Sequence, residues 1–443
     1  MFARRMFAAA AVLLAAGSAV RSETFVLAEP VQAGDCFHVA IDMKLTGEIR
    51  VHQNDNSVKL PLTTAAAHDF QERVLAADAD GLIHKTARVY ATANADIKVS
   101  NNAAQRTLRP DRRLVVAQRD KQQLLAYSTG GAFTQEELAM AHDHFNTLVL
   151  PGLLPGKAVA VGDTWKIPNA VAQEVCLFEG LTEQTLTGKL EDVKDGVAVF
   201  SITGASNGID DGAMVKTIVT ATGKFDLQAK RVVELSWTQK DERDQGPVSP
   251  ASTVEATTTL TRKAIDQPQC LSDVALVSAP SDAPPASLTQ LEFRDPKGRF
   301  SFLYGREWQI TSQTDGHVVL RLLDNGDFVA QATLTPWTTM EKGKHLTPEA
   351  FRDAMNDTPG WEPAMDLQDG EAPSTDDRWI YRLSQLGKMD NVDVLQNFYL
   401  VAAPTGEQMV AAVTLTPKQA DKLGARDLSL VGGIELPAPA EKK

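Results

Sequence analysis

Alternating apolar and polar residues define the first long element of this chain. Over residues 37–46 the apolar positions are Phe37, Val39, Ile41, Met43 and Leu45. Successive side chains of a strand point to opposite faces, so this period of two predicts a long antiparallel strand with one buried face. Further strands are predicted at 82–92, 114–119, 124–127, 197–203, 216–222, 231–237 and 254–260. Hairpin turn signals stand at Asp80-Gly81 and at 194–196.

One predicted helix interrupts these strands. Thr134 and Glu137 have the spacing of a capping box, which marks a helix start. Apolar residues follow at helical spacing at Leu138, Ala141, Phe145 and Leu148, and Pro151-Gly152 ends the pattern. We expect one helix over 134–150 to cover a curved sheet, or half-barrel. Two outcomes stay open: the helix fills the concave face, or it leaves an apolar site.

Prolines divide the chain into two predicted domains. At 443 residues the chain is longer than one hydrophobic core usually supports. Between Asp266 and Gln290, prolines alternate with Ser, Ala and Asp, which favours extended backbone with little to bury. The predicted organisation is a signal peptide (1–22), a mostly antiparallel β domain (23–265), a Pro-rich linker (266–289), a second domain (290–437) and a disordered tail (438–443).

The second domain begins with closely spaced aromatic residues and a tryptophan. These are Phe293, Phe300, Phe302, Tyr304 and Trp308. Strands are predicted at 318–323, 328–334, 379–386, 395–402 and 408–415, with an acidic turn at 324–327 and a closing helix at 417–423. Another helix is predicted to begin at Thr347, its N-cap, with Pro348 in the first helical position.

Residues 290–437 resemble PsbP-like domains, because these domains begin with the same aromatic hairpin followed by a tryptophan. The resemblance implies an α/β sandwich (an α+β fold) used mainly for binding and assembly. It supplies no common catalytic residues.

The first domain resembles uncharacterised exported bacterial proteins. The similarity lies in the segments 153–157 and 161–165 together with the strand-rich regions on either side. More distantly, the predicted plan is similar in architecture to the LolA/LolB-like lipoprotein-carrier fold, a curved antiparallel sheet with a helix. An architecture of this kind does not name a ligand.

The N-terminus has the three parts of an export signal. Arg4 and Arg5 precede an apolar run over 6–16, and small residues near Ala19 offer a cleavage site. The run is too short to remain as a membrane-spanning helix. Arg4-Arg5-Met6-Phe7 also has the core of a twin-arginine signal, so Sec and twin-arginine export both remain open. We expect a periplasmic or secreted protein without a stable membrane anchor.

Net charge and cysteine positions limit the partners and the metals. A formal charge of −13 argues against nucleic acid as a partner. Cys36, Cys176 and Cys270 are far apart in the sequence, so a zinc site is not expected. Two of them could join in an oxidising compartment, and the sequence does not choose the pair.

Three motifs carry candidate chemistry, and none has the context that the chemistry needs. His142 and His144 stand about 200° apart on the predicted helix, so they cannot hold one ion together. Ser206 lies in a GxSxG pattern, but a β-type run follows it where a nucleophile elbow requires a helix. The acidic turns at 78–81 and 324–327 match hairpins better than calcium loops.

These observations favour a binding or assembly module over an enzyme. We expect no catalytic, cofactor-binding or metal-binding residues, and as partner an extracytoplasmic protein or an apolar small molecule. Two alternatives stay open. The first is a carrier of an apolar, lipid-like ligand, because a curved sheet under a helix can enclose a cavity. The second is an unrecognised hydrolase.

Overall fold

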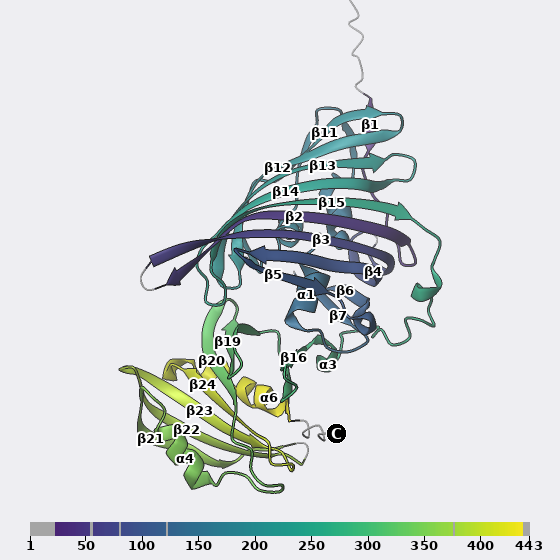
Figure 1. The fold of residues 1–443 in the computed structure, drawn as a ribbon. Coiled ribbons are helices and arrows are strands. Elements are labelled where there is room, and N and C mark those ends of the chain that lie inside the picture. Colours follow the sequence, from purple (N-terminus) through teal and green to yellow (C-terminus); the bar gives the residue numbers. More distant parts are fainter. Residues whose placement is uncertain (1–22, 54–55, 79–80, 121–122, 375–376, 437–443) are drawn as a thin grey trace, which may run out of the picture.

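Most of the described chain forms antiparallel strands in open sheets (Figure 1). The computed structural model describes residues 23–53, 56–78, 81–120, 123–374 and 377–436. The predicted signal peptide, the tail at 438–443 and Asp80 lie outside these residues. Within them, no helix is both long and apolar enough to span a bilayer.

The first sheet has 13 strands in the order β7-β6-β4-β3-β2-β15-β14-β13-β12-β11-β9, with β5 beside β4 and β10 beside β12. Their bounds are β2 (Cys36–Gln53), β3 (Asn56–Ala77), β4 (Ile83–Val99), β5 (Asn102–Thr107), β6 (Leu114–Asp120), β7 (Gln123–Ser128), β9 (Thr164–Lys166), β10 (Gly180–Gln184), β11 (Thr187–Lys194), β12 (Val197–Asp210), β13 (Ala213–Asp226), β14 (Arg231–Arg243) and β15 (Ala251–Ala264). A separate pair joins β1 (Thr24–Val26) to β8 (Ala158–Ala160).

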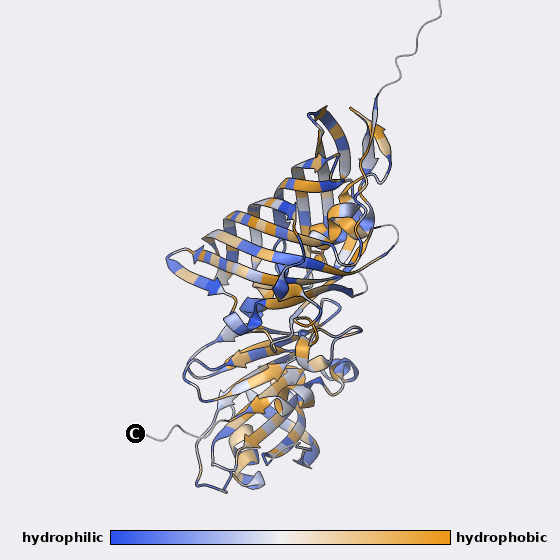
Figure 2. Cartoon of the chain, turned by 90° about the vertical axis from the view of Figure 1, so that its right-hand side faces the viewer, coloured by the Kyte–Doolittle hydropathy of each residue, from blue (hydrophilic) through white to orange (hydrophobic). Residues whose placement is uncertain are grey.

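The long strands of this sheet follow the predicted alternation, which Figure 2 shows as stripes of opposite hydropathy. Phe37, Val39 and Ile41 on β2 are buried in the main core, as the period of two predicts. The sheet curves around its buried face (Figure 1). Three short helical elements lie in the segment 135–175: α1 (Gln135–His142), the 3-10 helix η2 (Thr147–Leu153) and α2 (Asn169–Val175).

The prediction of a single covering helix over 134–150 is wrong. The capping box is confirmed, because Thr134 and Glu137 bond each other's backbone N–H groups. However, α1 ends at His142, and η2 begins after an interruption at 143–146. The Asn146 side chain accepts a hydrogen bond from the backbone N–H of Leu148 and so begins the new helix. A local polar side chain therefore breaks a helix that the apolar spacing alone would continue.

The C-terminal half contains two further sheets. The small sheet joins β16 (Leu291–Arg294), β17 (Ser301–Tyr304) and β25 (Ile434–Glu435). The larger one has the order β18 (Trp308–Gln313), β19 (Val318–Asp324), β20 (Asp327–Pro336), β24 (Gln408–Leu415), β23 (Val392–Ala402), β22 (Trp379–Met389) and β21 (Trp361–Glu371). The helices of this half are α4 (Pro348–Asn356), η4 (Pro417–Gln419), α5 (Ala420–Leu423) and α6 (Arg426–Gly432). Thr347 caps α4, as predicted.

The two halves share one continuous hydrophobic core. Phe133 forms a parallel bridge with Leu291, and its carbonyl accepts a hydrogen bond from the backbone N–H of Glu292 at 2.7 Å. Arg109 joins the halves electrostatically, because it pairs with Glu137 and also with Glu292. The division into two domains therefore remains a proposal, since apolar packing and ion pairs continue across the predicted boundary.

The Pro-rich segment packs on the outer, convex face of the first sheet. Leu271, in the 3-10 helix η3 (Gln269–Leu271), and Leu276 are buried against Ala87 of β4. The Lys85 ammonium donates to the Pro280 carbonyl. After this segment, α3 (Ala286–Thr289) leads into β16. Leu271, Leu276 and Lys85 therefore hold this segment against the sheet, although its proline content predicts that it buries little.

The shared core predicts that both halves unfold together. We expect a single calorimetric transition for the intact chain. Leu291→Ala removes a buried side chain where the halves meet, and we expect it to lower the free energy of unfolding by about 2–5 kcal/mol. Two separate transitions in the unmodified protein, only one of which Leu291→Ala shifts, would show instead that the halves are independent.

Candidate ligand-binding cleft

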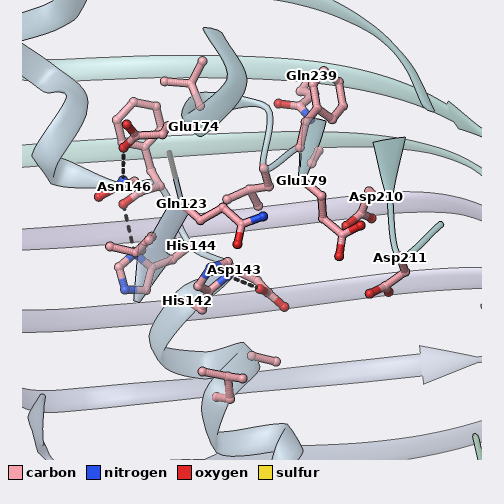
Figure 3. Close-up of a pocket in the computed structure, with 18 of the residues that line it drawn as sticks. Gln123, His142, Asp143, His144, Asn146, Glu174, Glu179, Asp210, Asp211 and Gln239 are labelled. Carbon is pink, nitrogen blue, oxygen red and sulfur yellow. Dashed lines mark hydrogen bonds and ion pairs between the residues drawn. The ribbon is translucent and has the colours of Figure 1, made fainter. Parts of the chain in front are cut away.

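A cleft of about 750 Å³ lies between the curved sheet and the helical elements (Figure 3). Its walls come from β2, β14 and β15 on the sheet side, and from α1, α2 and the segments after these helices on the other. Residues 210–211 close one end, and Arg306 and Gln309 of the C-terminal half also line it. The volume lies in the range of small-molecule sites.

Part of this cleft is an apolar wall. Met43 and Leu45 continue the alternating face of β2, but they are only half-buried and line the cleft. Leu138 of α1 lines it too, with Phe145 and Trp237, whose rings meet edge to face at 5.7 Å. The helices therefore do not fill the concave face of the sheet. Of the two outcomes that the sequence leaves open, the structure shows the second, a space with a partly apolar lining.

Carboxylates gather on the other side of the cleft. Figure 3 shows Asp143, Glu179, Asp210 and Asp211 close together. They come from three segments: the end of α1, the turn after α2 and the hairpin between β12 and β13. Arg243 is the cation beside them, and its Nη1 lies 2.7 Å from a carboxylate oxygen of Asp210. This side therefore carries more negative than positive charge.

Burial disfavours the ionised form of three carboxyl groups on this side, those of Asp210, Glu179 and Asp241. It raises the pKa of Asp210 to about 7, against the opposing effect of Arg243. Burial, followed by the neighbouring charge of Asp211, also raises the pKa of Glu179. The pKa of Asp241, which lines the same side from β14, is raised by burial as well. A cation in the cleft would therefore relieve an electrostatic cost already present in the fold.

Glu174 of α2 lies deeper in the wall. Its carboxylate pairs with the Arg119 guanidinium and accepts a hydrogen bond from the Asn146 amide at 3.1 Å. Burial nevertheless raises the pKa of Glu174 to about 7, while Arg119 acts in the opposite direction. This group connects α2 to the loop after α1, and so it fixes the spacing of the two helical elements beside the cleft.

A buried polar network anchors the loop after α1 to β3 and β4. The His144 Nδ1 faces the Phe145 carbonyl at 3.0 Å and must carry the proton, so its Nε2 accepts from the Tyr90 hydroxyl at 2.7 Å. The Thr147 hydroxyl donates to Glu72 and accepts from Arg88, which itself pairs with Glu72 at 2.8 Å. His144 and Thr147, at the two ends of this loop, are therefore both hydrogen-bonded to the sheet.

The placement of the two histidines differs from the helical prediction. His144 lies beyond the end of α1 and is buried, whereas His142 is partly exposed and bonds Asp143 at 2.9 Å. Burial holds the pKa of His144 well below its usual value and lowers that of the adjacent His68 to about 4, so both stay neutral at pH 7. In the part of the chain that the structure describes, no cluster of three or more His, Cys, Asp or Glu side chains could hold a metal ion.

The other predicted motifs lie outside the cleft. Ser206 is inside β12, opposite Thr217, and β13 follows it, so the strand-to-helix turn of a nucleophile elbow is not formed there. Its side chain is 1% exposed. The turn at 324–327 is a hairpin turn between β19 and β20, with positive φ at Asn325 and Gly326. Asp78, at the start of the other acidic turn, bonds the backbone of Leu82.

Sequence reasoning missed the acidic side of the cleft. Asp210-Asp211-Gly212 is a turn signal between the strands predicted at 197–203 and 216–222, so the sequence does contain a hairpin signal there. Its proximity to Glu179 and Asp143 depends on how α1 and α2 pack against the sheet. No local pattern in the sequence encodes that proximity.

The comparisons with known proteins give only distant structural similarity. No protein family profile matches the sequence, and no curated protein sequence does. Solved structures with some similarity include cyanobacterial PsbP (CyanoP) from Synechocystis sp. PCC 6803, at 13% identity, 36% coverage of this chain, 99% of that chain and a TM-score of 0.26. The Ran-binding protein Mog1p of Saccharomyces cerevisiae matches at 12% identity, 34% and 96% coverage and a TM-score of 0.25.

A protein from Bacteroides thetaiotaomicron VPI-5482 matches at 10% identity and a TM-score of 0.24, over 34% of this chain and 50% of that one. This chain thus spans half the length of that relative. The predicted PsbP-like resemblance has support only at this distant level.

The raised pKa of Glu174 predicts a pH-dependent cost in stability. Below its usual pKa of 4.5 the group is protonated in both the folded and the unfolded chain and costs nothing. As the pH rises toward about 7, ionisation favours the unfolded chain. Glu174→Gln removes this titration, so we expect the free energy of unfolding of the variant, relative to that of the unmodified protein, to be about 2.5 kcal/mol higher at pH 8 than at pH 5.

Denaturant unfolding of both proteins at the two pH values measures this difference. Ser206→Ala, a buried change outside the cleft, is the control and should show no such trend. A free energy of unfolding of Glu174→Gln that falls, relative to that of the unmodified protein, as the pH rises would contradict the assignment.

Proposed function

We propose that this protein is a non-enzymatic binding protein for a small amphiphile with an apolar body and a cationic group. The observation that carries the proposal is the 750 Å³ cleft, which has an apolar wall on one side and excess carboxylate on the other. Action outside the cytoplasm is part of the proposal and rests on residues 1–22 alone. Of the possibilities that the sequence leaves open, the proposal therefore favours a carrier of a lipid-like ligand over a module that only assembles with other proteins.

The apolar wall supports the first part of this ligand assignment, the apolar body. Met43 and Leu45 follow the buried residues Val39 and Ile41 on the same face of β2, yet they are only half-buried and line the cleft. A fully buried side chain of this kind gains roughly 1.5–3 kcal/mol over an exposed one. An alkyl or ring system lying on these residues would gain part of that free energy.

The carboxylates support the second part of the ligand assignment, the cationic group. Arg243 pairs with Asp210 and Asp211 and leaves Glu179 and Asp143 without an arginine or lysine within ion-pair distance among the described residues. An anionic head group would meet repulsion here, whereas an amine or quaternary ammonium would be attracted. Because protein partly encloses the cleft, such an interaction is stronger there than on an open surface.

An assembly role is the second candidate, and one observation favours it. The strand β21 is an edge of the seven-stranded sheet and is exposed over most of its length. Met365 and Leu367 on this edge are about half exposed. Open edges of this kind can pair with a strand of another protein. Pro363 shortens the part of the edge that could pair.

Competition between charged amphiphiles tests the proposed ligand class. The fluorescent probe N-phenyl-1-naphthylamine should bind in the cleft. We expect dodecyltrimethylammonium to displace it at a concentration at least about tenfold lower than dodecyl sulfate, both below micelle formation. The double change Glu179→Gln with Asp210→Asn should remove this preference and keep the binding of the probe.

Leu45→Gln should weaken binding of the probe by about 5- to 20-fold, because it replaces part of the apolar wall. The matched control is Ile218→Gln, an exposed apolar residue on the outer face of β13, which should change nothing. Equal losses in Leu45→Gln and Ile218→Gln, or equal displacement by both detergents, would contradict the proposal. Binding of β21 to a partner protein with no probe binding would favour assembly.

A further inference from the structure

Two of the three cysteines lie on the same face of the first sheet. Cys36 of β2, Arg73 of β3 and Ala87 of β4 form one cross-strand row. Ala87 packs against Leu271 on the convex side, which places the whole row on that side. All three cysteines are free thiols in this structure.

The segment after β15 brings Cys270 onto this row. The backbone N–H of Ile265 donates to the Cys36 carbonyl at 3.0 Å, so the chain leaves the sheet beside Cys36. It returns over β3, where the Arg73 guanidinium donates to the Leu271 carbonyl at 2.9 Å. The Cys270 thiol itself lies 3.1 Å from the side-chain oxygen of Gln71, the residue two positions from Arg73 on the same face.

Cys176 is excluded from this neighbourhood. It ends α2 and is buried in the main core on the concave side, together with Phe37 and Ile41. The sheet itself separates it from Cys36 and Cys270, so neither thiol can reach it without unfolding.

We propose that Cys36 and Cys270 form a disulfide in oxidising surroundings, which fastens the segment between the two halves to the convex face, while Cys176 stays a free thiol. The bond requires the Cys270 side chain to leave Gln71 and turn toward β2. Because Cys270 is exposed, an oxidant can reach it in the folded protein.

The chemistry is a thiol–disulfide exchange with an external disulfide, such as oxidised glutathione or a disulfide-exchange catalyst. The Cys270 thiolate attacks one sulfur of the external disulfide and releases the other as a thiolate. The Cys36 thiol then loses its proton and attacks the Cys270 sulfur, which releases the second external thiolate. Two protein thiols are oxidised to one disulfide, and one external disulfide is reduced to two thiols.

The order of attack follows from the surroundings of the two thiols. Burial raises the pKa of Cys36, with Arg73 opposing and the nearby Cys270 adding to the rise. A buried thiol with a raised pKa is a slow nucleophile toward an external oxidant. Cys36 therefore acts as the second, resolving thiol.

Oxidation of the purified, reduced protein by oxidised glutathione tests this pairing. After digestion without reductant, mass spectrometry should find a peptide pair that joins Cys36 to Cys270, and alkylation under denaturing conditions should label Cys176 alone. The crosslinked chain should also migrate faster on a non-reducing denaturing gel and melt a few degrees higher than the reduced chain.

Matched serine variants complete the experiment. Cys176→Ser should keep the crosslink, whereas Cys270→Ser, at an exposed position, should keep the fold and lose the crosslink, the mobility change and the melting shift. Three alkylated thiols after oxidation would overturn the pairing. A linkage to Cys176, a stable glutathione adduct on Cys270 or a dimer through Cys270 would overturn it equally.

Discussion

The buried contacts that tie the loop after α1 to β3 and β4 determine the shape of the concave side. Tyr90 holds His144, and the Glu72–Arg88 pair holds Thr147, so the chain is drawn onto one part of the sheet. A buried ion pair of this kind is costly to break, because either charge alone would remain unsolvated in the core. With the loop fixed there, the helices leave Met43 and Leu45 of β2 and residues 239–243 of β14 uncovered. The cleft is the space that remains.

The same arrangement explains why the cleft has two chemical characters. Met43 and Leu45 continue the apolar face of β2 past the part that the helical elements cover. The uninterrupted alternation of the strand places them on that same face. The carboxylates arrive from turns and helix ends, where polar residues are favoured by local structure. Burial raises the pKa of Asp210 and Glu179 once the fold brings these turns together. A cationic amphiphile would satisfy both surfaces at once.

The sequence predicted the features that depend on neighbours along the chain. The alternation over 37–45, the capping box at Thr134 and the N-cap at Thr347 are all present in the structure. The prediction failed where contacts distant in sequence decide the outcome. The helix expected to continue to 150 stops at His142, because His144 and Asn146 find partners in the core and in the next turn. The acidic side of the cleft, assembled from separate turns, had no local signal at all.

Methionine methyl NMR measures occupancy of the cleft most directly. The chain has 10 methionines, of which Met43 lines the apolar wall, while Met214 and Met365 are exposed elsewhere and serve as internal controls. On titration with dodecyltrimethylammonium below its micelle concentration, the Met43 methyl resonance should shift in a saturable way, and those of Met214 and Met365 should stay in place. Equal shifts at all three methyl groups, or a Met43 resonance that does not move, would contradict a ligand site in this cleft.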